Sequence, residues 1–223
     1  TRVSSYPLLR GMMDWSINWD KTATCGPVYD FANNFNRIFR PSQILNLNIF
    51  IEGFYIPSAD STRKDTVKVF LRDTIAPFIT IDSSKGLFNT NGSATINFTN
   101  AQNSRKYYLQ IKHRNSIETW SKTGGVIFTS SNANYNFTDN SSQAYGNNMK
   151  QIDNSPLRFA FYSGDINQDG SIDASDLSAV DNGASGSESG YVAADVNGDN
   201  FVDAADQSIV DNNAYNFISV VRP

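Results

Sequence analysis

Two short stretches near the C-terminus of this 223-residue chain place oxygen-bearing side chains at regular intervals. The first spans residues 165–176, with such side chains at its positions 1, 3, 5, 9 and 12. Position 6 is Gly170, which permits a left-handed turn, and position 7 offers the backbone carbonyl of Ser171. A large hard cation takes about six to eight oxygen ligands, which alternate residues of one tight loop can supply. This spacing predicts a calcium-binding loop.

The same pattern returns thirty residues later, at residues 195–206. Position 6 is here Asn200, which also tolerates a left-handed backbone. The alternative is an Asp/Asn-rich turn without metal, but a second copy at a fixed offset favours two bound Ca²⁺ ions. Without them the crowded carboxylates would repel and the segment would fold poorly. The predicted ligands are Asp165, Asn167, Asp169, Ser171, Asp173 and Asp176 in the first loop, and Asp195, Asn197, Asp199, Phe201, Asp203 and Asp206 in the second.

Both loops are of the EF-hand type, and each is followed by a predicted short helix without a helix before it. In this arrangement residues 163–223 resemble a type I dockerin module. The resemblance implies a small α-helical fold and docking onto a cohesin through loop positions 10 and 11 and through basic residues further along each helix. The matching residues here are Ala174-Ser175, Ala204-Ala205, Asp181-Asn182 and Asp211-Asn212, none of them basic. A purely structural calcium module fused to its neighbour is the alternative.

Charge is divided unevenly along the chain, whose net charge is −4. Residues 161–223 hold 11 of the 22 acidic residues and one basic residue, Arg222. The other basic residues are spread thinly, which argues against nucleic-acid binding. No apolar run is long enough to span a membrane, and a single cysteine excludes an internal disulfide framework. Abundant Asn, Ser and Thr favour a secreted or cell-surface protein.

Alternating hydrophobicity dominates residues 44–162 and predicts an all-β sandwich. The predicted strands include residues 45–51, 67–71, 94–98, 107–113, 126–129, 135–138 and 157–162. The absence of helical patterns between them argues against parallel βαβ units. The single histidine, His113, falls on the apolar side of its strand, which favours a buried, hydrogen-bonded role over catalysis. Phe70, Tyr108 and Trp120 are interpreted as surface aromatics, forming either a sugar-stacking platform or ordinary packing.

The first 40 residues predict a strand that ends in polar residues, followed by a helix with an apolar face. A strand followed by a helix is the repeating unit of a TIM barrel, which would put Trp15 and Asp20 at the active-site rim. The run Gly-Met-Met-Asp-Trp-Ser-Ile-Asn-Trp-Asp, residues 11–20, resembles the last barrel strand of glycoside hydrolase family 18 chitinases. The resemblance implies that Trp15 forms the floor of a sugar subsite. A strand and helix that pack on the sandwich are the alternative.

The family 18 catalytic run Asp-x-x-Asp-x-Asp-x-Glu is absent from the sequence, so no catalytic residue is assigned and enzyme activity is left open. We therefore expect a barrel unit at 1–40, a β-sandwich accessory domain at 44–162 and a dockerin-like module at 163–223. The leading interpretation is the C-terminal part of a secreted chitin-degrading glycoside hydrolase, supplying carbohydrate targeting or attachment. The alternative is a non-catalytic extracellular assembly or attachment protein that contacts a cohesin or identical subunits.

Overall fold

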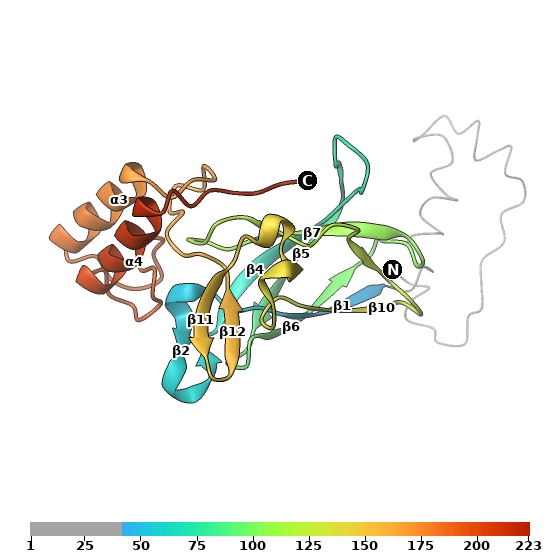
Figure 1. Cartoon of the computed structure of the whole chain (residues 1–223), viewed down its shortest axis with the longest axis horizontal. Coiled ribbons are helices and arrows are strands. Elements are labelled where there is room, and N and C mark those ends of the chain that lie inside the picture. Colours follow the sequence, from blue (N-terminus) through green and yellow to red (C-terminus); the bar gives the residue numbers. More distant parts are fainter. Residues whose placement is uncertain (1–41) are drawn as a thin grey trace, which may run out of the picture. The chain divides into compact units, whose positions relative to one another are not determined.

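The structure, a computed structural model, describes residues 42–223. The predicted barrel unit at residues 1–40, with Trp15 and Asp20, lies outside the described residues and stays a prediction. The described part forms one compact unit from Gln43 onward, with strands at its centre and two helices at one end (Figure 1). Within it, no helix is long and apolar enough to cross a membrane.

Short strands make up most of the chain before residue 161. They are β1 (Gln43–Asn48), β2 (Tyr55–Ile56), β3 (Ser61–Thr62), β4 (Asp65–Arg72), β5 (Thr80–Phe88), β6 (Ser93–Phe98), β7 (Lys106–Lys112), β8 (Thr119–Trp120), β9 (Val126–Ile127), β10 (Asn132–Asn136), β11 (Lys150–Asn154) and β12 (Leu157–Ala160). The 3-10 turns are η2 (Glu52–Phe54), η3 (Pro57–Ala59), η4 (Ser141–Gln143) and η5 (Tyr145–Asn147). Two α-helices follow, α3 (Ala174–Ser185) and α4 (Ala204–Tyr215).

Two sheets form the predicted all-β sandwich, which the structure confirms. One has the order β10-β1-β6, with β1 parallel to β10 and antiparallel to β6. The other has the order β5-β4-β7-β8, and β9 also pairs with β7. Its central strand β4 is antiparallel to both neighbours, so that Val69 lies between Ser84 and Ile111.

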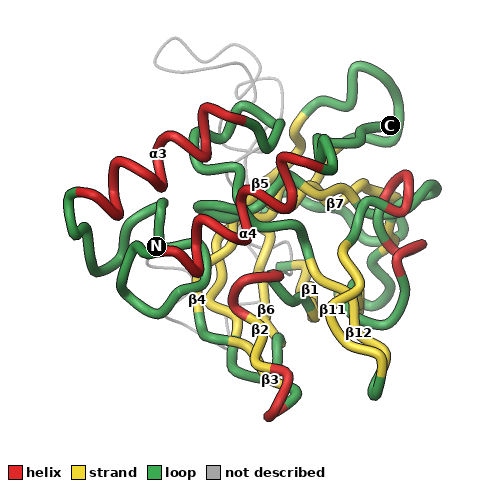
Figure 2. The backbone as a smooth tube through the Cα atoms, turned by 60° about the vertical axis from the view of Figure 1, so that its left-hand side comes forward, coloured by secondary structure: helices red, strands yellow, loops and turns green. Residues whose placement is uncertain are grey.

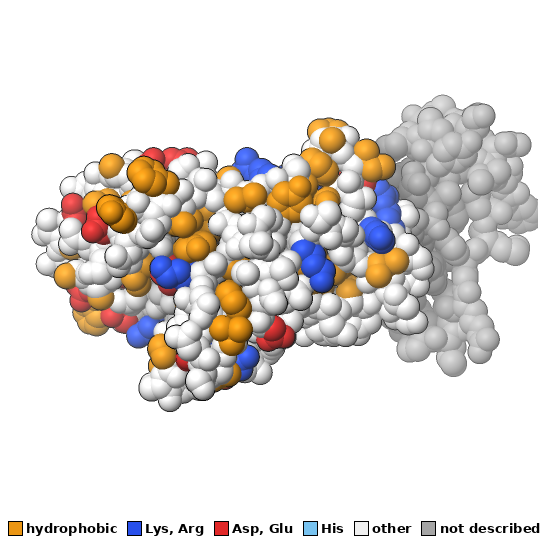
Figure 3. Space-filling model, in the orientation of Figure 1, with side chains coloured by type: hydrophobic (Ala, Val, Ile, Leu, Met, Phe, Trp, Pro, Cys, Tyr) orange, Lys and Arg blue, Asp and Glu red, His pale blue; other side chains and the backbone are white. Residues whose placement is uncertain are grey.

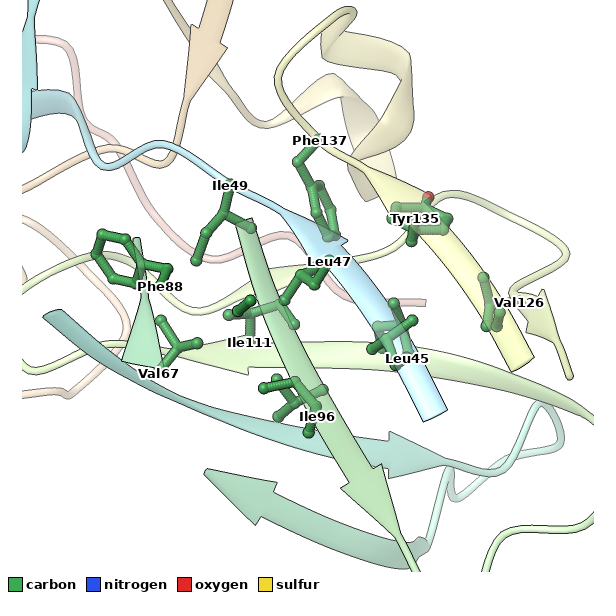
Figure 4. Close-up of a cluster of buried hydrophobic side chains, with 14 of the residues drawn as sticks. Leu45, Leu47, Ile49, Val67, Phe88, Ile96, Ile111, Val126, Tyr135 and Phe137 are labelled. Carbon is green, nitrogen blue, oxygen red and sulfur yellow. The ribbon is translucent and has the colours of Figure 1, made fainter. Parts of the chain in front are cut away.

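The core lies between the two sheets because side chains alternate between the faces of a strand. Leu45 and Leu47 of β1 are fully buried, whereas Asn46 between them is half-buried on the outer face. Val67 and Ile111 of the other sheet point toward the same interior (Figure 4). The period of two in the sequence therefore determines which residues build the core.

Some predicted strands differ from the observed ones. The strand predicted at 45–51 ends at Asn48, because the chain then leaves β6 and pairs with Phe161 through an isolated bridge at Ile51. The strands predicted at 126–129 and 135–138 are replaced by the shorter β9 and by the earlier β10. The sequence analysis missed β5, whose residues are mostly polar because one edge of the sheet faces solvent.

We expect Leu47→Ala to lower the free energy of unfolding by about 2–5 kcal/mol, because it leaves a cavity in the core between the sheets. Thr95→Ala on the exposed face of the neighbouring strand β6 is the matched control and should cost well under half as much. Urea unfolding followed by tryptophan fluorescence measures both values. Equal losses for the two variants would contradict the assignment of the buried face.

Candidate calcium sites

Each predicted calcium loop runs directly into a helix through a capping box. The Asp173 carboxylate accepts a hydrogen bond from the backbone N–H of Ser175 at 2.8 Å, and the Asp176 carboxylate accepts one from the N–H of Asp173 at 3.1 Å. Asp203 and Asp206 repeat this arrangement at the start of α4. Loop positions 9 and 12 therefore begin the helix as well as serving as predicted ligands.

The loop backbones contain left-handed residues at two positions. At position 6, Gly170 has φ 94° and Asn200 has φ 73°. Position 4 is also left-handed, with φ 59° at Gln168 and 74° at Gly198, which the sequence analysis did not foresee. Both loops thus turn in the same way although their residues at these positions differ.

Successive predicted ligands are joined along each loop. The Asn167 side-chain oxygen accepts from the N–H of Asp169 at 2.8 Å, and Asp169 accepts from the N–H of Ser171 at 2.9 Å. Asn197 and Asp199 make the same two bonds in the second loop, at 2.8 and 3.0 Å. These bonds hold alternate side chains on one tight turn, as convergence on a single cation requires.

The first and last carboxylates of each loop are buried: Asp165, Asp176, Asp195 and Asp206 are at most 1% exposed. Burial, together with the negative charges of Asp176 and Asp169, raises the pKa of Asp165 to about 6. Burial also raises the pKa of Asp206. Buried carboxylates that lie close together favour a bound cation.

The donor atoms fit Ca²⁺ because they are carboxylate, amide and backbone oxygens, the ligands of a hard cation. Position 7 would contribute a backbone carbonyl, from Ser171 or Phe201. The individual ligands stay predictions, and the residues that would hold the ions are the twelve named from the sequence.

The two loops differ in their positive partners. Asp195 lies 3.4 Å from Nη2 of Arg114, a residue that follows strand β7 of the sandwich. Arg114 also donates from Nε to Asp65 at 2.9 Å and packs over the ring of Tyr191 at 4.5 Å. Within residues 42–223, Asp165 at the same position of the first loop has no basic side chain at ion-pair distance. Among the described residues, the sandwich therefore forms an ion pair with the first carboxylate of the second loop only.

Backbone contacts hold the second loop against the sandwich. Arg63 donates to the carbonyl of Asn197 at 2.9 Å, and the Asn115 side chain donates to the carbonyl of Asp195 at 2.8 Å. A Cβ atom on Gly198 would lie 2.9 Å from the ring of Phe54, so only glycine permits this approach.

The chain after α4 holds the first loop. Ile172 donates to the carbonyl of Ile218, and Val220 donates to that of Gly170, both at 2.8 Å. The segment then reaches the sandwich, where Nε of Arg222 lies 2.9 Å from the Glu118 carboxylate. Each loop is therefore fastened to the sandwich by a different part of the chain.

A small hydrophobic core joins the helices, which lie side by side (Figure 2). Ile172 and Val202, at position 8 of the two loops, are buried in it together with Val180 and Val210. Ile117 of the sandwich belongs to the same cluster. The core is thus shared with the neighbouring domain.

His113 is buried, as the sequence analysis favoured. Its Nε2 lies 3.2 Å from Asp65, and its ring meets Phe54 edge-on. Burial lowers the pKa of His113, while hydrogen bonds from His113, Tyr191 and Arg114 hold the pKa of Asp65 below its usual range against the effect of burial. The sequence analysis missed Asp65 and Arg114 as contacts of the site, because they are far from the loops in sequence and no motif marks them.

Residues 163–213 match the family model described as the type I dockerin domain. The chain therefore carries a type I dockerin domain at its C-terminus, preceded by an all-β sandwich. Domains of this type typically bind calcium. The match supports the dockerin part of the sequence prediction and gives no support to the link with family 18 chitinases.

Solved structures to which the chain is similar include two crystal structures of type II cohesin-X-dockerin complexes from Acetivibrio cellulolyticus. The one with a C-terminal interface mutant shares 14% identity at a TM-score of 0.46 and covers 78% of this chain and 99% of that chain. The one with an N-terminal interface mutant shares 16% identity at a TM-score of 0.42 and covers 79% and 97%. No curated protein matches the chain.

Removal of calcium should make the stability of the dockerin domain depend on pH. The raised pKa of Asp165 means that the folded, metal-free domain binds this proton more tightly than the unfolded chain does. The resulting stabilisation is present at low pH and is lost as the pH rises through about 6. In EDTA, Asp165→Asn should therefore melt several degrees above the wild type at pH 7 and close to it near pH 4.

Differential scanning calorimetry at the two pH values measures this difference. His113 makes stability depend on pH in the opposite direction, because its lowered pKa makes stability fall as the pH drops below about 6.5. The wild type and the Asp165→Asn variant share this contribution. In excess Ca²⁺ at pH 7 the Asp165→Asn variant should melt below the wild type, since the variant lacks a ligand. A difference in EDTA that is the same at both pH values would refute this account of Asp165.

We expect Arg114→Gln to lower the melting temperature more in EDTA than in excess Ca²⁺. Without metal, Arg114 is the positive partner of buried Asp195, whereas a bound ion would take over that role. Arg105→Gln, which breaks the partly exposed pair with Asp73 elsewhere on the sandwich, is the matched control. Equal shifts of Arg114→Gln in both buffers would refute the role of Arg114 in neutralising Asp195, since its pair with Asp65 does not depend on the metal.

Proposed function

We propose that this protein binds a cohesin through its dockerin domain and is thereby attached to an extracellular assembly of the cellulosome type. The observation that carries the proposal is the pair of loop–helix repeats that match the type I dockerin domain. Dockerin modules are found in extracellular cellulosome proteins. Under this proposal each loop holds one Ca²⁺, two in all, and the ions keep the helices in place for docking.

The residues at the predicted cohesin-contacting positions are accessible. They are exposed at positions 10 and 11 of both loops and along both helices, namely Ala174, Ser175, Ala204, Ala205, Asp181, Asn182, Asp211 and Asn212. The small side chains at the helix starts would allow close approach of a partner surface. Apolar and acidic side chains share the face of this domain seen in Figure 3.

The two repeats are not equivalent at the ends of their helices. Tyr215 and Phe217 are 82% and 87% exposed, whereas the corresponding residues of the first repeat are Ser185 and Ser187. Phe217 also has φ 53°, a left-handed backbone that is uncommon for a bulky residue. Large exposed aromatics are frequent anchors of protein interfaces. We infer that the end of α4 makes the main contact.

Electrostatics adds a requirement on the partner. Neither helix carries a basic residue, and Asp181 and Asp211 are exposed on them. Arg222, the one basic residue after residue 160, lies against Glu118 of the sandwich. The cohesin surface that fits is therefore uncharged or basic where it meets the helices.

The assembly function is better supported than the role as part of a chitin-degrading hydrolase. The dockerin match supports attachment of the protein to a cohesin. The residues that resemble family 18 chitinases lie outside the residues that the structure describes.

Tyr215→Ala and Phe217→Ala should each weaken cohesin binding by about tenfold or more, as expected for interface anchors. Ser185→Ala and Ser187→Ala, at the equivalent positions of the first repeat, are the matched controls and should bind as the wild type does. Calorimetric titration with a panel of purified type I and type II cohesins in Ca²⁺ measures the affinities. Failure of the wild type to bind any cohesin would overturn the proposal, and equal losses in both pairs would overturn the role of α4.

A further inference from the structure

A cavity of about 440 Å³ is lined by residues of the β5-β4-β7-β8 sheet, by the turn before β5 and by the end of the chain. Its lining combines aromatic side chains, Phe70, Phe78 and Trp120, with the cations Arg72, Lys112 and Arg222. Ligand pockets in proteins have volumes of roughly 300–1,000 Å³ and pair apolar walls with a few polar groups. The dockerin match assigns no role to this part of the sandwich.

The aromatic wall is rigid. Phe78 meets Trp120 edge-to-face at 6.4 Å and Tyr108 at 5.9 Å, and the Trp120 indole N–H donates to Glu118 at 2.7 Å. Tyr108 and Trp120 are buried, so their interpretation as exposed aromatics was wrong. They lie on the outer face of the sheet as predicted by alternation, but the turn that carries Phe78 covers them.

The cations of the cavity exceed its anions. Glu118 is the one acidic side chain in the lining, and it is shared by Lys112 at 3.0 Å and Arg222 at 2.9 Å. Arg72 has neutral partners, since Nε donates to Gln110 at 2.7 Å and Nη1 to Thr80 at 2.6 Å. Among the residues that the structure describes, Arg72 forms no ion pair, so its charge and its Nη2 donors are available to an anion.

Arg72 is also held in position for a ligand. Its guanidinium lies 5.4 Å from the ring centre of Trp120 and 5.9 Å from that of Phe70. A planar donor fixed between two rings loses little freedom when it binds a carboxylate.

We propose that this cavity binds one uronic acid unit of an acidic polysaccharide. The carboxylate would meet Arg72, the C–H face of the sugar ring would lie on the partly exposed rings of Phe70 and Phe78, and hydroxyl groups would reach Gln110 and Lys112. A neutral sugar would leave the Arg72 charge without a partner. A purely apolar ligand would leave the amide and the cations unpaired.

Calorimetric titration of the full chain with trimers of galacturonic and glucuronic acid tests the proposal. Free Ca²⁺ is held constant in the buffer, because uronates bind calcium themselves. We expect a dissociation constant of about 0.1–1 mM, and neutral galactose and glucose trimers should bind at least about tenfold more weakly. No binding of either uronate, equal binding of neutral trimers, or tighter binding of a glutamate tripeptide would each overturn the proposal.

Variants locate the site. Arg72→Gln should weaken uronate binding by about tenfold or more, the effect of losing one charge-assisted hydrogen bond. Lys85→Gln removes an exposed charge from the same sheet outside the cavity and should leave binding unchanged. Arg222→Gln removes a second cation of the lining, whose side chain is 54% exposed, and should also weaken uronate binding. Full affinity in both arginine variants would refute the cavity as the site, and melting curves confirm that each variant is folded.

Discussion

The C-terminal domain depends on how four buried carboxylates are neutralised. Asp165, Asp176, Asp195 and Asp206 lie inside a domain whose own hydrophobic core consists of a few aliphatic side chains. The desolvation of a carboxylate costs several kcal/mol unless a positive charge compensates it, and such a small core cannot offset that cost alone. Hydrogen bonds from the loop backbone satisfy part of each group but supply no net charge. A bound cation at each loop would supply that charge, and the same acidic residues also cap the helices.

The sandwich places a basic side chain at ion-pair distance from a buried carboxylate of the second loop. Among the described residues, it does not do so for the first loop. Arg114 joins Asp195 to Asp65, so that one guanidinium serves a buried acid on each side of the domain boundary. The first loop receives backbone contacts from the segment after α4 but no such charge. Two repeats with the same loop–helix pattern thus have different electrostatic surroundings, because Arg114, which follows β7, reaches the first carboxylate of only one of them.

Local patterns in the sequence were sufficient for the elements whose signal is local. The loop ligands, the two helices and the buried face of most strands follow from spacing and alternation, which depend on neighbouring residues. The pairing of Asp65 with Arg114 and Tyr191 could not be predicted, since it joins residues 49 and 126 positions apart. Burial of Tyr108 and Trp120 was missed for a related reason. Alternation indicates the face on which a side chain lies, but not which distant segment covers that face.

The dockerin domain is attached to the sandwich at both of its ends. Where the chain enters, the N–H of Gly164 donates to the carbonyl of Asn115 at 2.7 Å, and where it leaves, Arg222 meets Glu118. A partner bound to α4 would pull on both attachments at once. Tension would then be shared between two connections that lie at opposite ends of the domain sequence, so that the domain would not be held through one end alone.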